Sequence, residues 1–150
     1  MEERFKLFTV LMTKTRRSIQ RIKTEEMSEY NLKSPHVSCL YYLYKYGNMT
    51  ATELCEICDE DKAAISRSIV QLENEGYVDY PDGSKKRYRA NMQLTEKGRV
   101  IAESLASKID TVLDEAGQGL TEEDRVIFYR SLALISNNLE KICKKYDKNN

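Results

Sequence analysis

The sequence predicts a mainly α-helical protein with one small β-hairpin, and three observations carry that prediction. The 150 residues include only two prolines and six glycines, so few positions interrupt a helix. Apolar residues recur at steps of three and four over most of the chain, which is the spacing of an amphipathic helix. An alternating pattern follows only after the turn-forming residues Pro81 and Gly83, where a hairpin is expected.

Four helices are expected before the hairpin. The first covers residues 5–30, and the second begins at Ser34-Pro35, with Ser34 as its N-cap. The third is a short helix after Thr50, because Thr50 and the glutamate three residues later fit a capping box. The fourth ends at Gly76, since glycine readily adopts the left-handed conformation that closes a helix.

The hairpin and two further helices complete the chain. The two strands are expected over 77–80 and 87–94, on either side of the turn. Thr95 is expected to cap the next helix. Thr121 is expected to cap the last one, where Asp124 stands at the capping-box position.

Residues 34–95 therefore predict a winged helix-turn-helix. The turn over 59–61 is short and polar, and the fourth helix can bury Ile65, Ile69 and Leu72. The opposite side of this helix carries small and basic groups, which suit close approach to the bases and phosphates of duplex DNA. We expect DNA contacts from Lys62, Ala63, Ala64, Ser66, Arg67 and Gln71, and from Ser34 and His36 at the start of the second helix.

The tip of the hairpin is strongly basic. A basic tip suits contact with phosphates or with the minor groove. Taken alone, such a turn is more often simply solvated, but its place directly after a helix pair favours DNA contact. The expected contact residues of this wing are Ser84, Lys85, Lys86, Arg87 and Arg89.

The ordered set of motifs resembles the MarR (multiple antibiotic resistance regulator) family of bacterial transcription regulators. The resemblance rests on the Leu-Glu-x-x-Gly at 72–76 and the Leu-Thr-x-x-Gly at 94–98, and it extends over most of the chain. It implies a homodimer that binds DNA. The family's Asp-x-Arg near the wing tip is absent here, so its arginine role would pass to Arg87 or Arg89.

Nearly half of the chain lies outside the DNA-binding core, in helices with apolar stripes. One short core cannot cover these stripes, so a second copy of the chain is expected to bury them. We divide the chain into an N-terminal dimerisation helix (1–33), the DNA-binding core (34–95) and C-terminal dimerisation helices (96–150). A two-fold dimer would hold two recognition helices about 34 Å apart, matching a palindromic site. The alternative is a monomer whose terminal helices pack on its own core.

The cysteines raise a separate question. Cys55 and Cys58 are three residues apart and follow a His36-x-x-Cys39 pair, a set that resembles a zinc site. Both pairs fall within expected helices, whereas zinc knuckles place such pairs in turns. Packing as small buried hydrophobic residues is therefore favoured. A thiol- or metal-responsive regulator that uses Cys55 and Cys58 stays as an alternative.

The sequence contains no convincing catalytic set. It has one histidine, no glycine-rich phosphate loop and no nucleophile beside a plausible base, so we expect neither an enzyme nor a bound cofactor or metal. The MarR resemblance implies a small aromatic or anionic effector. Candidate ligand-binding residues are Tyr30, Tyr41 and Tyr44, although tyrosines at helical spacing more often belong to a core.

Together these features predict a sequence-specific, double-stranded-DNA-binding transcription regulator, a ligand-responsive repressor that acts as a homodimer. The 24 basic and 24 acidic residues cancel, which argues against a nonspecific polyanion-binding protein but not against a segregated basic surface. Charges interrupt the apolar residues near the start, so neither a signal peptide nor a membrane span is expected, and the protein is expected to be cytoplasmic. The alternative function is a winged-helix protein-interaction module that does not read DNA.

Overall fold

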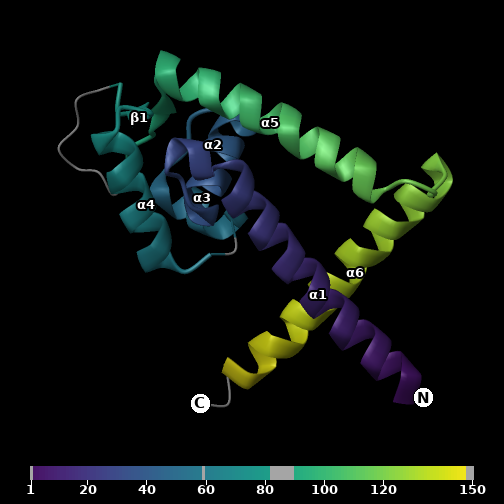
Figure 1. Cartoon of the computed structure of the whole chain (residues 1–150). Helices are drawn as coiled ribbons and strands as arrows, with labels where there is room; N and C mark the ends of the chain where they lie inside the picture. The colour runs from purple at the N-terminus through teal and green to yellow at the C-terminus, as the bar shows by residue number, and fades with distance from the viewer. Residues whose placement is uncertain (1, 59, 82–89, 148–150) are drawn as a thin grey trace. The chain divides into compact units, whose positions relative to one another are not determined.

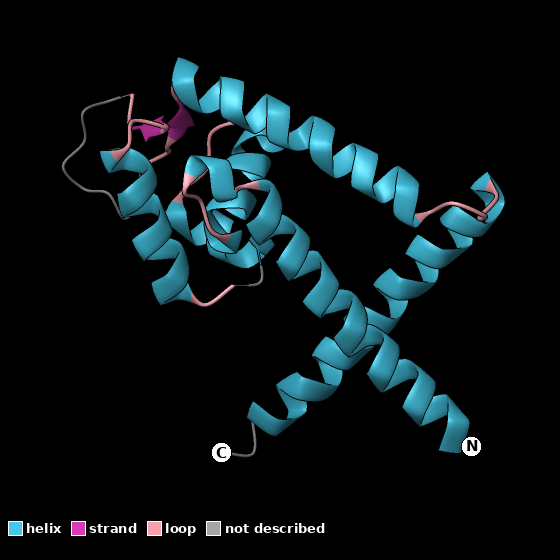
Figure 2. Cartoon of the chain, viewed as in Figure 1, coloured by secondary structure: helices cyan, strands magenta, loops and turns pink. Residues whose placement is uncertain are grey.

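The computed structural model describes residues 2–58, 60–81 and 90–147 (Figure 1). The described part is mainly helical with one small antiparallel hairpin, which confirms the predicted fold class (Figure 2). The chain forms two compact units, residues 1–109 and 110–150. The elements are α1 (Glu2–Glu26), the 3-10 helix η1 (Ser28–Tyr30), α2 (Ser34–Tyr46), α3 (Ala51–Cys58), α4 (Lys62–Asn74), β1 (Val78–Asp79), β2 (Gln93–Leu94), α5 (Glu96–Ala116) and α6 (Glu122–Asp147).

Helix α2 lies at the centre of the first unit. It packs against α1, α3, α4 and β2, and its buried residues occupy most of its circumference. A helix that is buried along most of its length needs neighbours on several sides, which explains why Tyr41, Tyr42 and Tyr44 are half-buried while Val37 and Leu40 are fully enclosed. The surrounding elements contribute Leu54 from α3 and Leu72 from α4, both 0% exposed. This core holds α4 in a fixed orientation.

The first helix is shorter than predicted. Helix α1 ends at Glu26, and the chain then forms η1 in place of a continuous helix up to Tyr30. The Met27 carbonyl accepts hydrogen bonds from the backbone N–H groups of Tyr30 and Leu32, at 3.1 and 3.2 Å. Met27 and Leu32 are both buried, so the chain leaves the helical path to insert two apolar side chains into the core.

The start of α2 also differs from the prediction. Lys33 is the N-cap, whereas Ser34 is already helical and Pro35 follows in the first turn. The ring nitrogen Nδ1 of His36 accepts a hydrogen bond from the Lys33 backbone N–H at 2.8 Å. This side chain performs the role that a glutamate or glutamine has in an ordinary capping box, and therefore a serine or threonine cap is not needed.

The capping boxes at Thr50 and Thr121 are confirmed. Thr50 Oγ1 accepts from the Glu53 backbone N–H at 3.2 Å, and a Glu53 carboxylate oxygen accepts from the Thr50 backbone N–H at 2.7 Å. Thr121 and Asp124 repeat the arrangement at 3.1 and 3.0 Å. The predicted cap at Thr95 is present too, because its Oγ1 accepts from the Gly98 N–H at 3.0 Å.

The hairpin strands are shorter than predicted. Among the residues that the structure describes, two strand pairs form, Val78 with Leu94 and Asp79 with Gln93. Met92 instead exchanges two backbone hydrogen bonds with Met49, which precedes α3, at 2.9 and 3.2 Å. The backbone of Met92 therefore pairs with a residue that is distant in sequence and not with the first strand. Residues 87–89 of the predicted second strand lie outside the described residues.

Close packing explains why position 98 of helix α5 is a glycine, although glycine has a low helix propensity. A Cβ atom at this position would lie 1.9 Å from the backbone carbonyl oxygen of Tyr77. The start of α5 therefore packs directly on the backbone that links α4 to β1. Only glycine permits this approach, which secures the base of the hairpin.

The second unit differs from the first in the burial of its main helix. Helix α6 has no buried residue among those that the structure describes. Arg125 bonds to the Gly117 carbonyl and lies 3.7 Å from Asp114, which ties the start of α6 to the preceding turn. In the described part of the chain, no helix is long and apolar enough to cross a membrane.

Candidate nucleic-acid interface

Helix α4 separates its side chains into two faces. Ile65, Ile69 and Leu72 are at most 5% exposed and pack into the core, as predicted. The solvent-facing side of α4 near its N-terminus carries the predicted contact residues. Of these, Lys62, Ala63, Ser66 and Arg67 are exposed, and Ala64 and Gln71 are half-buried. We call this set the α4 face.

The N-terminus of α4 is fixed by an aspartate that sequence reasoning did not single out. Asp61 is the N-cap, and its carboxylate accepts a hydrogen bond from the Ala64 backbone N–H at 3.1 Å. One turn later, Ser68 is buried and donates from Oγ to the Ala64 carbonyl at 2.8 Å. An Asp directly before the first turn of an amphipathic helix is a recognisable capping signal, so this cap could have been found from the sequence.

A cleft of about 290 Å³ lies between the start of α2 and the α4 face. Lys33 and Pro35 line it on one side, and Ala64, Arg67 and Gln71 line it on the other. Two cationic side chains therefore border a concave site next to the N-terminus of a helix. Such a site attracts anionic groups, because the helix dipole adds to the side-chain charges.

His36 forms the floor of this cleft. It is 3% exposed, and its ring nitrogen Nδ1 accepts a hydrogen bond from the Lys33 backbone N–H, while Gln71 of α4 lines the same cleft. Gln71 donates to Glu75 at 2.8 Å. Burial lowers the pKa of His36, with Glu75 and Gln71 acting in the opposite direction. His36 and Gln71 therefore line the cleft from the start of α2 and from α4.

The predicted wing contacts cannot be placed in the same way. Ser84, Lys85, Lys86, Arg87 and Arg89 lie outside the described residues. The base of the wing is described, and Tyr77 there is buried beside Gly98. The Lys97 ammonium lies 4.3 Å from the centre of the Tyr77 ring and donates to the Glu75 carbonyl at 2.7 Å. The end of α4 and the hairpin are thus joined at their base.

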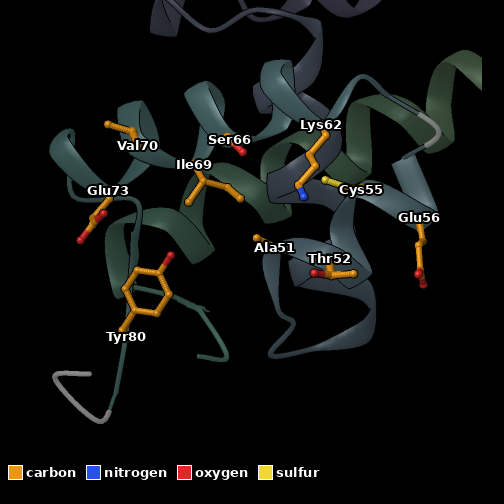
Figure 3. Close-up of a pocket in the computed structure, with 10 residues that line it drawn as sticks. All are labelled: Ala51, Thr52, Cys55, Glu56, Lys62, Ser66, Ile69, Val70, Glu73 and Tyr80. Carbon is orange, nitrogen blue, oxygen red and sulfur yellow. The ribbon is translucent and has the colours of Figure 1, made fainter. Parts of the chain in front are cut away.

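A second concave surface adjoins the α4 face, and it was not predicted from the sequence. A groove of about 300 Å³ runs between α3, α4 and the end of β1 (Figure 3). Figure 3 shows Ala51 and Cys55 of α3 opposite Lys62 and Ile69 of α4, with Tyr80 at the other end. Its lining is mainly apolar, so the surface around the recognition helix is not uniformly polar.

The three candidate ligand tyrosines are all half-buried against the core. Tyr30 belongs to η1, whereas Tyr41 and Tyr44 belong to α2. The Tyr41 ring meets Tyr42 edge-on, with centroids 5.4 Å apart, and the Lys45 ammonium lies 5.6 Å from the centre of the Tyr41 ring. The role of these residues in effector binding stays a prediction.

The cysteines are reduced in this structure. Cys39 is buried in the core, and Cys55 and Cys58 are half-buried against it. The described residues contain no group of three or more His, Cys, Asp or Glu side chains placed to hold a metal ion. Cys55 lines the groove beside Lys62, while Cys58, the last residue of α3, is absent from the lining of that groove. The Cys-x-x-Cys spacing therefore places the two α3 thiols in different surroundings.

Helix order, the capped recognition helix and the hairpin define a winged helix-turn-helix protein, and comparison with known proteins shows which family it is similar to. Residues 30–87 match the sequence model of the MarR family. The chain is therefore similar to the MarR family over these residues, and its curated relatives are HTH-type transcriptional regulators.

Individual relatives agree with this assignment. The chain is 26% identical over 133 residues to the uncharacterized HTH-type transcriptional regulator YwaE of Bacillus subtilis, covering 86% of this chain and 78% of the relative. It resembles the structure of a MarR family regulator from Neisseria meningitidis with a TM-score of 0.76 at 18% identity, covering 93% and 97% of the two chains. It also resembles S. aureus MepR in its DNA-binding conformation, with a TM-score of 0.78 at 16% identity and coverage of 88% and 98%.

Proposed function

We propose that this protein is a transcription regulator that binds double-stranded DNA through the α4 face. The observation that carries the proposal is the division of α4: one side closes the core, and the other presents Lys62, Ser66 and Arg67 to solvent. Small side chains between these groups allow the helix to approach base edges in the major groove. Arg67 is the residue best suited to a guanine or a phosphate.

The cleft at the start of α2 supplies the second part of the proposed interface. Lys33 and Arg67 border it, and Ser34 begins the helix there. A DNA phosphate at this position would be held by the two cations and the helix N-terminus. His36 is enclosed, so we assign it the role of orienting α2 against α4; direct DNA contact by this residue stays a prediction.

The relatives support this function. The family and the matched B. subtilis protein are described as transcriptional regulators. S. aureus MepR, which has a similar fold, has been solved in complex with DNA. The proposed contribution of the wing, through Lys85, Lys86, Arg87 and Arg89, follows from charge alone.

The finer proposal is a homodimeric, ligand-responsive repressor that acts in the cytoplasm on a palindromic operator. Exposed apolar residues on α1, such as Phe5 at 74%, and on α6, such as Leu139 at 46%, support a second copy as the partner. A small aromatic or anionic effector is proposed for Tyr30, Tyr41 and Tyr44.

Dimerisation can be tested by light scattering coupled to gel filtration. The double substitution Ile135→Glu with Leu139→Glu places two charges on exposed apolar positions of α6 and should convert the dimer to a monomer. The matched control, Asn137→Glu with Asn138→Glu, adds the same charge at exposed polar positions of the same helix and should remain dimeric. A wild-type protein that is monomeric at micromolar concentration would contradict the dimer.

DNA binding can be tested by selecting bound fragments from a genomic pool of the source organism at low salt. We expect enrichment of a small set of fragments that share a palindromic sequence. Affinity for these fragments should fall by about 10³-fold or more between roughly 50 and 200 mM salt, as phosphate contacts are lost. An absence of binding to any fragment at low salt would favour the protein-interaction module instead.

A further inference from the structure

The backbone carbonyls that connect the end of α4 to β1 accept hydrogen bonds from one short segment at the start of α5. The Glu75 carbonyl accepts from the Lys97 ammonium at 2.7 Å, and the Gly76 carbonyl accepts from Thr95 Oγ1 at 2.7 Å. The Tyr77 carbonyl accepts from the Thr95 backbone N–H at 3.0 Å. We call these contacts the α4 clasp. Through them the start of α5 holds the C-terminal end of the recognition helix.

Lys97 is the charged member of the clasp. The last carbonyls of a helix have no partner within the helix and carry its negative partial charge, so an ammonium group there makes a favourable contact. The same ammonium lies 4.3 Å from the centre of the Tyr77 ring, which places it in a cation–π contact. Tyr77 is only 7% exposed, so its ring is held in the core and gives the ammonium a fixed support. Lys97 therefore joins the helix end to the residue just before β1.

The clasp acts at one end of α4, whereas the proposed DNA contacts lie nearer the other end. Arg67 stands eight residues before Glu75, about 12 Å away along the helix axis. Helix α4 has 13 residues, or about 20 Å, so a tilt of about 10° at its C-terminal end moves its N-terminus by about 3 Å. A displacement of that size is enough to break a hydrogen bond to a base edge.

The apolar core restrains this tilt less than the clasp does. Ile69 and Leu72 hold α4 against the core through apolar contacts, which have no preferred direction. The hydrogen bonds of the clasp depend on both distance and angle, so they favour one direction of the helix axis. The orientation of α4 therefore depends on the contacts at its C-terminal end as well as on its buried face.

We propose that Lys97 is a positioning residue for DNA recognition: it fixes the tilt of α4 so that the α4 face meets the major groove in one orientation. The proposal rests on the proposed function, since it concerns how that face is presented to DNA. Lys97 acts through α4 and not through a phosphate contact of its own. Lys97→Met removes the ammonium but keeps a long side chain, so α4 keeps its buried face and loses one restraint at its end.

The positioning role can be measured without DNA. Residual dipolar couplings of backbone amides report the direction of each helix in the free full-length protein. We expect Lys97→Met to change the direction of α4 relative to α2. Lys97→Arg should preserve it, because a guanidinium can still donate to the Glu75 carbonyl and lie over the Tyr77 ring. An unchanged direction of α4 in Lys97→Met would overturn the proposal.

The consequence for recognition is measured on a fragment selected by the wild-type protein. Lys97→Met should bind it about tenfold more weakly, whereas Lys97→Arg should stay within about threefold of the wild type. Arg99→Met is the matched control, since it removes an exposed cation two positions away on the same helix, and it should bind like the wild type. Stoichiometric titration separates this effect from partial unfolding, which lowers the fraction of active protein and not the affinity of the folded molecules.

A scrambled fragment of the same base composition separates positioning from direct contact. Loss of a phosphate contact weakens binding to all sequences about equally, whereas loss of orientation weakens the selected sequence most. We expect Lys97→Met to bind the scrambled fragment like the wild type. An equal loss on both fragments, or no loss on the selected one, would overturn the positioning role. If the wild type binds no fragment at all, the proposed function is wrong, while the dipolar couplings still decide whether Lys97 orients α4.

Discussion

Helices α2 and α4 of the first unit and helix α6 of the second use their apolar residues in opposite ways. Leu40 of α2 and Leu72 of α4 are 0% exposed, whereas Phe128 and Leu139 of α6 are 48% and 46% exposed. The first set completes a core within one chain and thereby fixes the recognition helix. The second set has amphipathic spacing but no enclosing neighbours in its own unit. The difference indicates that the first unit folds around its own core. It supports the proposal that the exposed apolar residues of α6 contact a second copy of the chain.

The largest expected effect separates these two kinds of apolar position. Leu72→Ala should lower the free energy of unfolding by about 2–5 kcal/mol at every protein concentration, because it leaves a cavity in a closed core. Leu139→Ala should cost little in dilute protein and more as the concentration rises, since we propose a second copy as its partner. Urea unfolding at several concentrations measures both. If the effect of Leu139→Ala did not vary with protein concentration, the proposed difference between the two kinds of apolar position would be wrong.

The next effect concerns the junction between α5 and the hairpin base. Gly98→Ala should destabilise the first unit by about 1–3 kcal/mol or more, because its Cβ meets the Tyr77 carbonyl oxygen, a backbone atom that has little freedom to move. Glu103→Ala, at an exposed position of the same helix, serves as the control and should change stability by less than about 0.5 kcal/mol. Thermal unfolding compares the two variants, and equal melting temperatures would rule out the close approach.

Capping substitutions make the same chemical change in each unit. Thr50→Ala and Thr121→Ala each remove a hydroxyl that accepts a backbone hydrogen bond, so each should cost about 1 kcal/mol. Amide hydrogen exchange shows which helix loses stability in each variant. We expect faster exchange in α3 for Thr50→Ala and in α6 for Thr121→Ala. Faster exchange throughout the chain for both variants would show that the two units unfold together.

The smallest expected effect is a pH dependence that belongs to the first unit. The folded chain holds the pKa of His36 below its ordinary value of 6.5, so below that pH the unfolded chain binds more protons. This contribution to stability is complete above pH 6.5 and is lost as the pH falls from there through the lowered folded-state pKa. His36 is the only histidine, so NMR can follow its titration directly. A measured His36 pKa above 6.5 in the folded protein would contradict a buried side chain whose Nδ1 accepts a hydrogen bond.

Local sequence patterns predicted the parts of this structure that depend on neighbouring residues. The capping boxes at Thr50 and Thr121 need only a residue three positions away, and the core face of α4 follows from helical period. The DNA-contact set on α4 was likewise proposed from its exposed pattern, and its role remains to be tested by experiment. Helix α1 was predicted too long because Met27 and Leu32 turn into a core that is built by distant segments.

Long-range contacts account for what the sequence could not predict. The second strand is short because Met92 pairs with Met49, more than forty residues earlier. The cleft beside Arg67 forms only when the start of α2 meets α4. Each of these features depends on the packing of two elements and not on the composition of either one.

The most direct test of the central claim is the DNA affinity of Arg67→Ala, measured by fluorescence anisotropy on a selected fragment against Arg99→Ala. Both substitutions remove one exposed arginine from the first unit, but only Arg67 lies on the α4 face. We predict that Arg67→Ala loses about 1–3 kcal/mol of binding free energy, or roughly 5- to 150-fold in affinity, while Arg99→Ala binds like the wild type. Equal affinities for the two variants would contradict DNA recognition by the α4 face.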